Sequence, residues 1–466
     1  MAPYNQVVSE AAPFWRNTHR NPDWLQLVAI FASVFCAVFA LGYSFTGGFA
    51  VQQYAYVATS PAQAVVGRTT LMNLPQSGVS RSVQSAHQVD RAQQSGLLLH
   101  AASGAVRRDA SINRPKIDPK KMVLIGVAAD SGCGKSTFMR RLTGIFGDGK
   151  TTPLGGGFGG GGWETNTLVS AKTTVMCLDD YHLNDRAGRK VTGLTALDER
   201  ENNFNLMYEQ LSALKRGETI AKPIYNHVNG TLDTPEEIAP SPIMIVEGLH
   251  PMLDDRVAGL LDFSIYLDIS DRVKFAWKIQ RDMAERGWAL EDIKKDIEKR
   301  KPDFDKYVAP QKAKADMVIE VLPSAIAPPK DETSPMEYLR VRLIQKTTTK
   351  HFDPVYLIEK GSSLTWKPCG ENLQCEYPGV QFAYYTEDYM GHPAEVLEMD
   401  GVIHNLKEGL YVEKFLHNTG SKEFGELTQE LLKLQNSPGG DNGTGFMQTL
   451  AALKIREIFE RATGQK

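Results

Sequence analysis

The sequence predicts an α/β fold, with a mostly parallel sheet flanked by helices and a β-rich and helical C-terminal region. Short, continuous apolar runs recur at residues 122–128, 173–178, 243–246 and 263–268, as expected of strands that are buried on both faces. Amphipathic helical patterns follow these runs, which is the order of a parallel sheet built from strand–helix units. A glycine-rich loop directly follows the first run and marks the point where chemistry is expected.

Length and composition describe a globular protein with a sizeable core. The chain has 466 residues, of which 42% are hydrophobic and 23% are charged, so neither wholesale disorder nor a multi-span membrane protein fits. Its 52 Lys and Arg residues are balanced by 55 Asp and Glu residues, and therefore no basic excess indicates nucleic-acid binding. Five cysteines in so long a chain exclude a disulfide-built scaffold.

The first 117 residues differ from the rest and are interpreted as a two-part plastid-targeting presequence that is removed. Residues 24–67 contain no charged side chain, and their apolar run at 25–41 suits a signal sequence or a membrane span. Residues 68–117 are rich in Arg and Ser and poor in acidic residues, as is typical of transit peptides. This layout predicts delivery to the stroma of a plastid with extra bounding membranes. A retained membrane anchor followed by a linker is the alternative.

A phosphate-binding loop follows the first predicted strand. The segment ADSGCGKST, from Ala129 to Thr137, runs into a helical pattern over residues 138–146, so it has the strand–loop–helix order of a P-loop. Its glycines let backbone amides surround a phosphate, its lysine brings a charge to the β- and γ-phosphates, and its serine reaches Mg²⁺. The expected nucleotide-binding residues are Gly132, Cys133, Gly134, Lys135, Ser136 and Thr137. Ala129 replaces the usual first glycine, which is compatible with the loop if its φ is negative.

Acidic side chains follow two of the later predicted strands. Asp179 and Asp180 come directly after residues 173–178, and Glu247 follows residues 243–246. Ligands of open α/β sheets bind beyond the carboxyl ends of the strands, where one carboxylate can accept a hydroxyl proton and another can assist Mg²⁺. The residues themselves leave open which aspartate is the base, and such a pair can also simply cap a turn.

Charged residues share one face of the helix that is predicted over residues 271–286. Lys278, Arg281, Asp282 and Arg286 are spaced i, i+3, i+4 and i+8. A cationic face at this place can close over a phosphorylated substrate and the transferring phosphoryl group. A solvated face with internal ion pairs is the alternative.

Together these segments resemble the phosphoribulokinase family, ATP-dependent enzymes that make ribulose 1,5-bisphosphate in photosynthetic carbon fixation. The match runs from about residue 122 to the C-terminus and includes GVAADSGCGKSTFMRRLT, CLDDYH, KPIYNHVNG, VEGLHPM, DFSIYLDIS, KFAWKIQRDMAERG and RKPDFDKYVAPQK. The resemblance implies a P-loop kinase core of the kind shared with uridine kinases. We expect this core over residues 118–335 and a β-rich and helical region over residues 336–466.

The resemblance implies ribulose 5-phosphate as substrate and Mg-ATP as phosphoryl donor. Asp179 would be the general base, Glu247 would assist Mg²⁺ with Ser136, Lys135 would act on the phosphates, and Asp282 would be a further active-site carboxylate. The residues that would hold sugar phosphate and transition-state charge are His182, Arg186, Tyr225, His227, Lys278, Arg281 and Arg286. A kinase with another acceptor, such as uridine, and a catalytically idle assembly protein are the alternatives.

The resemblance also implies redox regulation through two disulfides, Cys133–Cys177 and Cys369–Cys375. The first pair lies at the ends of two strands that we expect to be side by side, and the helix start and Lys135 are expected to lower the pKa of Cys133. Their bond would switch catalysis off, whereas two buried cysteines without a redox role are the alternative. The implied partners are thioredoxin, a second copy in a homodimer, and glyceraldehyde-3-phosphate dehydrogenase bound through a small disordered linker protein. No nucleic acid is expected.

Overall fold

The structure is a computed structural model. It describes residues 118, 121–130, 132–146, 152–154, 167–170, 172–227, 229–286, 289–329, 336–367, 377–437 and 439–464. The predicted presequence, with its apolar run at 25–41, lies outside the described residues, and so do Cys369 and Cys375. Within these described ranges, no helix is both long and apolar enough to cross a membrane.

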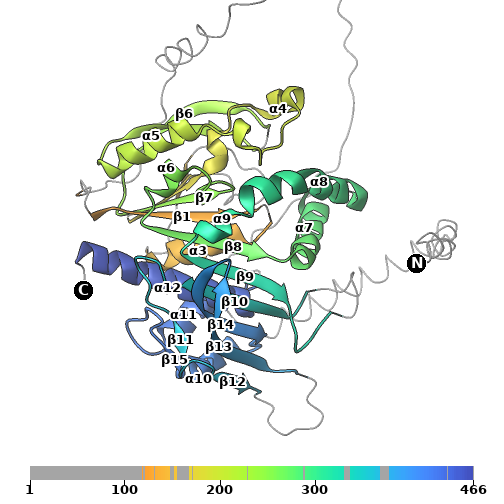
Figure 1. The fold of residues 1–466 in the computed structure, drawn as a ribbon, viewed down its shortest axis with the longest axis vertical. Coiled ribbons are helices and arrows are strands. Elements are labelled where there is room, and N and C mark those ends of the chain that lie inside the picture. The colour runs from red at the N-terminus through yellow and green to blue at the C-terminus, as the bar shows by residue number, and fades with distance from the viewer. Residues whose placement is uncertain are drawn as a thin grey trace, which may run out of the picture. The chain divides into compact units, whose positions relative to one another are not determined.

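An eleven-stranded sheet organises the described part of the chain, in the order β12-β13-β14-β10-β9-β8-β1-β7-β4-β3-β2 (Figure 1). Its central strands β9, β8, β1, β7 and β4 are mutually parallel. Their bounds are Met317–Pro323, Phe263–Ile269, Val123–Ala129, Ile243–Gly248 and Thr173–Cys177. Four of these strands are the predicted apolar runs, and every residue of those four is buried. The predicted α/β fold is thereby confirmed.

Antiparallel strands extend the sheet at both edges. Strands β3 (Thr167–Val169) and β2 (Thr152–Leu154) lie beyond β4. Beyond β9 lie β10 (Leu339–Lys346), β14 (His392–Gly401), β13 (Val380–Tyr389) and β12 (Ser363–Trp366). Strands β9 and β10 pair along seven residues, so one sheet continues across residue 335, where the core and the C-terminal region are expected to meet.

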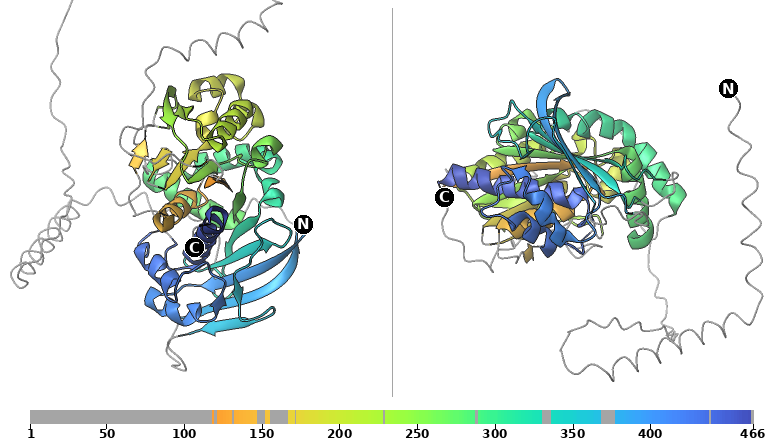
Figure 2. Two further views of the ribbon diagram at one scale, coloured as in Figure 1. Left: turned by 90° about the vertical axis from the view of Figure 1, so that its left-hand side faces the viewer. Right: turned by 90° about the horizontal axis from the view of Figure 1, so that it is seen from below.

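Helices cover both faces of the parallel strands because alternate side chains of a strand point to opposite faces. Val123 and Ile125 of β1 join a hydrophobic cluster with α3 (Lys135–Phe146) and α12 (Gly443–Thr463). Leu124 joins a second cluster on the other face, with α5 (Phe204–Lys215) and α6 (Asp255–Ala258). Helix α12 lies beside α3 (Figure 2). The C-terminal segment therefore packs directly on the helix that follows the phosphate loop.

Helix α12 has clear capping signals at both ends. The Asn442 side chain accepts a hydrogen bond from the backbone N–H of Thr444, and Gly464 ends the helix in the left-handed conformation with φ 67°. Together these caps define a helix of 21 residues in the region that was expected to be β-rich and helical. Its buried Lys454 pairs with Asp353 (3.2 Å), which ties the helix to the segment that precedes β11.

The remaining elements surround the carboxyl ends of the parallel strands or complete the C-terminal region. Helices α7 (Asp271–Arg286) and α8 (Leu290–Asp303) follow β8, and the π-helical turn η4 (Phe304–Val308) and α9 (Gln311–Lys314) lead into β9. After β4 come η2 (Leu178–Tyr181), α4 (Arg186–Thr192) and η3 (Glu199–Glu201), and β5 (Ile220–Tyr225) pairs with β6 (Leu232–Ile238). The C-terminal region adds β11 (Tyr356–Leu357), η5 (Leu406–Glu408), α10 (Gly409–Glu413), β15 (Leu416–His417) and α11 (Glu426–Lys433).

One predicted neighbour relationship is wrong. The strands that lead to Cys133 and Cys177 were expected to lie side by side, but β7 lies between β1 and β4. The register aligns Cys177 with Glu247 on β7, and Glu247 with Val127 on β1. Local apolar patterns predict that a strand exists, but its neighbours depend on how the connecting helices pack.

Candidate active site

The phosphate loop has the backbone that its glycines predict. Strand β1 ends at Ala129, and α3 begins at Lys135. Gly132 and Gly134 adopt left-handed φ values of 84° and 75°, which side chains other than glycine rarely accept. Ala129 is the last residue of β1 and is not among the residues with positive φ, so the alanine at this position does not strain the loop. The loop therefore leads its backbone amides to the N-terminus of α3, where a phosphate is favoured.

Glu247 lies beside Lys135. The register places Glu247 at the end of β7, between the phosphate loop and the end of β4, and its carboxylate forms an ion pair with the Lys135 ammonium. Burial alone would lower the pKa of Lys135, but Glu247, followed by Cys177 and Asp179, raises it above its usual value. Burial raises the pKa of Glu247, and Lys135 opposes this shift. The lysine is thus held charged at the start of α3.

Asp180 is part of a closed, buried network. Its carboxylate forms an ion pair with Lys222 and accepts a hydrogen bond from the backbone N–H of Tyr225 at 2.7 Å. Lys222 also pairs with Glu236 at 3.0 Å, and the Thr167 hydroxyl donates to Glu236. Asp180, Lys222 and Glu236 are each less than 5% exposed. This network joins η2 to the β5–β6 hairpin, and it leaves Asp180 turned away from solvent.

Asp179 faces the opposite way and is partly open to solvent. Its side chain is 26% exposed, and its Oδ2 lies 3.9 Å from Nε2 of His227. Burial would raise the pKa of Asp179, but His182, Lys135, His227 and His250 together lower it to about 2. A carboxylate that is ionised, accessible and near the phosphate loop has the properties of a general base.

Aromatic and basic side chains surround Asp179. The Tyr225 ring lies edge-on to the rings of His182 (5.4 Å between centroids) and His227 (4.9 Å). Arg189 donates a hydrogen bond to the Tyr225 hydroxyl (2.5 Å), and Arg186 donates to the backbone carbonyl of His227 (2.8 Å). The predicted residues His182, Arg186, Tyr225 and His227 are therefore brought together with Asp179.

Two residues of this cluster were missed by sequence analysis. Arg189 lies three positions after Arg186 on α4, and this helical spacing was the available signal. His250 is buried and follows Glu247 by three positions, and burial lowers its pKa to about 4 although Asp179 opposes the shift. A lone histidine after a strand gives no sequence signal of such an environment.

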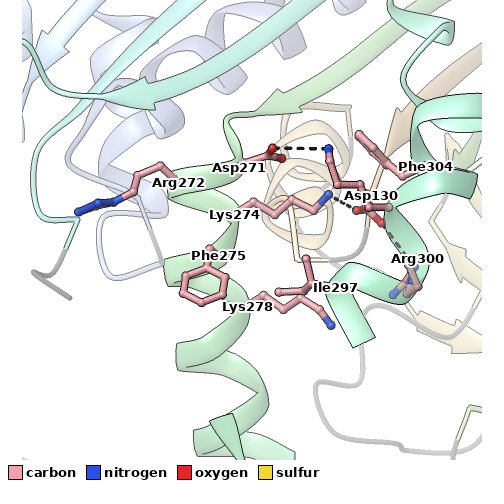
Figure 3. A pocket seen from close by; sticks show the side chains of 10 residues that line it. Asp130, Asp271, Arg272, Lys274, Phe275, Lys278, Ile297, Arg300 and Phe304 are labelled. Atoms are coloured by element: carbon pink, nitrogen blue, oxygen red, sulfur yellow. Dashed lines mark hydrogen bonds and ion pairs between the residues drawn. The ribbon is translucent and has the colours of Figure 1, made fainter. Parts of the chain in front are cut away.

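A second group of charges lies between α7, α8 and the phosphate loop, around a pocket of about 400 Å³ (Figure 3). Asp130 of the loop pairs with Lys274 of α7 (2.5 Å) and with Arg300 of α8 (3.5 Å). Lys278, which was predicted to bind substrate, pairs with Asp296 of α8 (3.0 Å). Four residues of this group were not predicted, because their roles depend on the packing of α8 against α7. They are Asp130, Lys274, Asp296 and Arg300. The side chains of Arg281, Asp282 and Arg286 lie outside the described part of α7.

The predicted lowering of the Cys133 pKa is wrong. Cys133 and Cys177 are both free and buried. Burial, followed by the Asp130 carboxylate, raises the pKa of Cys133 to about 12, although Lys274 and Lys135 oppose the shift. Burial also raises the pKa of Cys177 well above its usual value, with Glu247 and Asp179 adding to it. The helix start and Lys135 were expected to lower the pKa of Cys133. Their effect is outweighed because the thiolate would form in a dry site that already contains carboxylates.

The residues of the loop fit Mg-ATP. Gly132 and Gly134 supply the left-handed backbone that lets successive amides converge on a phosphate. Lys135 offers a charge to the phosphates, while the Ser136 hydroxyl and the Glu247 carboxylate offer the oxygen ligands that Mg²⁺ prefers. All of these groups come from the loop, the start of α3 and the end of the neighbouring strand β7.

A parallel sheet with a phosphate loop after its central strand, and with carboxylates beyond the ends of its neighbours, defines a P-loop α/β kinase. A family model described as "Phosphoribulokinase / Uridine kinase family" matches residues 124–327. A chloroplastic phosphoribulokinase from Mesembryanthemum crystallinum is 58% identical over 344 residues, which are 74% of this chain and 85% of that relative. The chain therefore belongs to the phosphoribulokinase and uridine kinase family, and it is an enzyme.

Two further relatives show where the similarity is concentrated. A phosphoribulokinase from Synechocystis sp. is 50% identical over 345 residues, covering 74% of this chain and 96% of the relative. A uridine kinase from Borrelia hermsii is 27% identical over 200 residues, covering 42% of this chain and 85% of the relative. The similarity to phosphoribulokinases is thus both higher and longer than the similarity to this uridine kinase.

Proposed function

We propose that the protein transfers the γ-phosphoryl group of ATP to D-ribulose 5-phosphate and so makes ribulose 1,5-bisphosphate in photosynthetic carbon fixation. The observation that carries this proposal is the ionised, accessible carboxylate of Asp179 among basic side chains of the β4 end and the β5–β6 hairpin. A sugar phosphate brings a dianion that these groups can hold, whereas uridine is neutral and gains nothing from them. The 58% identity to a phosphoribulokinase, against 27% to a uridine kinase, supports the same acceptor.

In the proposed reaction, Asp179 takes the proton of the C1 hydroxyl as its oxygen attacks the γ-phosphorus, and ADP leaves. Lys135 remains charged throughout, because Glu247 raises its pKa, and it stabilises the charge that develops on the phosphates. Mg²⁺ bound by Ser136 and Glu247 would neutralise phosphate charge. The sugar phosphate is oriented next to Asp179 by four side chains, those of His182, Arg186, Tyr225 and His227.

The helical face of α7 is proposed to act from the other side of the phosphate loop. Lys278 is buried and held by Asp296, so its ammonium has a fixed position relative to α8. Asp130 links the same two helices to the phosphate loop through Lys274 and Arg300. Lys278, with Arg281 and Arg286, would stabilise transition-state charge, and Asp282 would contribute a further carboxylate.

Redox switching through Cys133 and Cys177 is a further part of the proposal. The two thiols would give up two protons and two electrons to a disulfide oxidant such as oxidised thioredoxin, and reduced thioredoxin would reverse the step. Because β7 lies between the strands that lead to the two cysteines, a bond between Cys133 and Cys177 would require the phosphate loop to move towards the end of β4. We propose that this movement of the phosphate loop is what switches catalysis off in the oxidised protein. The pair Cys369–Cys375 is proposed as a second, hairpin disulfide.

The setting of the reaction is inferred from the relatives and from the presequence. Relatives named chloroplastic support a plastid location, and the two-part composition of residues 1–117 suits a plastid with extra bounding membranes. We further propose a homodimer, and an oxidised form that binds glyceraldehyde-3-phosphate dehydrogenase through a small disordered linker protein. The kinase core of this proposal spans residues 118–335, and residues 336–466 complete it.

The test is ADP release by the protein with ribulose 5-phosphate and, separately, with uridine, each before and after reduction with a dithiol. Activity with ribulose 5-phosphate that rises after reduction is expected, and Cys177→Ser should make it independent of reduction. Turnover of uridine in place of ribulose 5-phosphate would refute the acceptor. Equal activity of the oxidised and reduced protein would refute the thiol switch and leave the acceptor standing.

A further inference from the structure

Three different metal-ligand atoms meet at the carboxyl end of β4. They are the Cys177 sulfur, a carboxylate oxygen of Asp179 and a ring nitrogen of His227, and they all lie within 4.8 Å of one another. The residues come from two separate segments of the chain, because His227 follows β5, whereas Cys177 ends β4 and Asp179 lies in the η2 turn that follows it. The packing of the β5–β6 hairpin against η2 therefore creates the group.

The His227 ring is available and is held in place. Its Nε2 is buried and has no hydrogen-bond partner, and it lies 3.9 Å from Asp179 Oδ2. The ring lies edge-on to Tyr225 at 4.9 Å, and Arg186 donates a hydrogen bond to its backbone carbonyl (2.8 Å). A buried nitrogen without a partner is costly unless a ligand occupies it. The nitrogen is thus a preformed ligand that points at a carboxylate.

The donor set selects a particular kind of metal. Sulfur, imidazole nitrogen and carboxylate oxygen are the three ligands of tetrahedral Zn²⁺, with bond lengths of about 2.0 to 2.3 Å, whereas Mg²⁺ takes oxygen ligands alone. Ligand atoms around tetrahedral Zn²⁺ are about 3.5 Å apart, so the group needs to contract by only about an ångström. The thiolate and carboxylate bring two negative charges, which match the charge of the ion.

We propose that the reduced protein binds Zn²⁺, or a similar thiophilic divalent cation, through Cys177, Asp179 and His227, with water in the fourth position. On binding, the Cys177 thiol loses its proton to solvent and the sulfur bonds to the metal, so no electron is transferred. Because the thiol must release a proton to bind the metal, the affinity increases as the pH rises. The ion enters from the open side, where Asp179 and His227 are each 26% exposed.

Occupation of this site blocks the proposed reaction. A metal-bound carboxylate of Asp179 can no longer accept the hydroxyl proton, and a metal-bound Cys177 can no longer form a disulfide. These two consequences rest on the proposed function, but the binding itself does not. Zn²⁺ would thus act as an inhibitor that is distinct from Mg²⁺, although both ions bind at the ends of neighbouring strands.

The test uses Co²⁺ as a spectroscopic probe with the reduced full-length chain. The variant Cys369→Ser/Cys375→Ser serves as background, so that the other closely spaced pair of cysteines cannot contribute. One equivalent of Co²⁺ should give a thiolate-to-metal charge-transfer band in the near ultraviolet. Zn²⁺ should remove this band stoichiometrically, and a large excess of Mg²⁺ should not.

Matched variants locate the site. Cys177→Ser should abolish the band, and His227→Gln should weaken Zn²⁺ binding by roughly tenfold or more. Cys133→Ser is the control, because Cys133 is also buried and lies within the phosphate loop but is not in the group, and this variant should retain the band. Circular dichroism shows whether each variant is folded. Absence of the band in the background protein, or its persistence in Cys177→Ser, would overturn the proposal.

An activity measurement separates binding from its consequence. If the protein is a phosphoribulokinase, stoichiometric Zn²⁺ should stop ADP release and a chelator should restore it. A charge-transfer band without inhibition would overturn the claim that Zn²⁺ captures the base. If no acceptor is turned over at all, the proposed function fails, and the band still decides the metal site by itself.

Discussion

Asp179 and Asp180 are consecutive in the sequence, but their carboxylates lie in two regions with opposite character. Asp180 lies in a dry region, where Lys222, Glu236 and the backbone of Tyr225 surround it. Asp179 lies in an open region, where histidines and Lys135 surround a carboxylate that is 26% exposed. A buried acid with its partners in place is structural, whereas an ionised acid that solvent and substrate can reach is free to take a proton.

The two regions also differ in what they can tolerate. The dry network is closed, since each of its charges has a partner, and removing one leaves the others uncompensated. The open region contains His182, His227 and His250, whose buried ring nitrogens include several without a hydrogen-bond partner. Changes to the first region should therefore affect folding, whereas changes to the second should affect chemistry and, at its buried histidines, the pH dependence of stability. Four experiments test this division, beginning with the largest effect.

The first experiment replaces each aspartate in turn. Asp179→Asn should lower kcat by about 10³-fold, because an amide cannot accept the hydroxyl proton. The measurement is ADP release with saturating ribulose 5-phosphate, normalised to folded protein. The matched control, Asp180→Asn, should lose stability but keep kcat within about tenfold of the parent in the fraction that folds. A larger loss of kcat in Asp180→Asn than in Asp179→Asn would reverse the assignment.

The second experiment breaks the dry network. Lys222→Met leaves Asp180 and Glu236 buried without their cation and should lower the free energy of unfolding by about 3–5 kcal/mol. Urea unfolding measures this change. Lys215→Met is the control, because Lys215 and Asp262 form a partly exposed pair (3.0 Å) that should contribute about 1 kcal/mol or less. Equal losses in both variants would show that burial does not distinguish the two pairs.

The third experiment uses the pH dependence of stability. Burial lowers the pKa of His250 from 6.5 to about 4, against the opposing charge of Asp179. Between these values the unfolded chain binds a proton that the folded chain does not, so the free energy of unfolding falls as the pH drops from about 6.5 to 4. The full contribution of this residue is about 3 kcal/mol. His250→Gln should remove it, which urea unfolding at a series of pH values would show. An unchanged slope in the variant would contradict the assignment.

The fourth experiment concerns the charges of α7 and α8, where a buried lysine, Lys278, pairs with a partly exposed carboxylate, Asp296. Asp296→Asn should release Lys278 and lower kcat/KM for ribulose 5-phosphate by about fivefold, as expected for an ion pair worth about 1 kcal/mol. The control is Glu291→Gln, which removes an exposed pair with Lys294 on the same helix and should leave kcat/KM unchanged. If kcat/KM is the same in both variants, Asp296 does not position Lys278.

Much of the local structure followed from the sequence. The four apolar runs became strands, because a strand that is buried on both faces needs apolar side chains at every position. The phosphate loop followed from its spacing, since Gly132 and Gly134 supply backbone conformations that other residues avoid. The acidic residues at the strand ends were found for a similar reason, because the carboxyl edge of a parallel sheet is where ligands bind.

Other features were decided by contacts between distant segments. Only the β5–β6 hairpin, more than forty positions along the chain, makes Asp180 structural, because it supplies Lys222 and the N–H of Tyr225. The strand order alone places β7 between the strands that lead to the two cysteines. Burial, followed by the Asp130 carboxylate, raises the pKa of Cys133 to about 12. Periodicity and spacing depend on neighbouring residues and are therefore visible in the sequence. Burial and electrostatic environment depend on which remote side chains pack together, and the tertiary structure alone determines them.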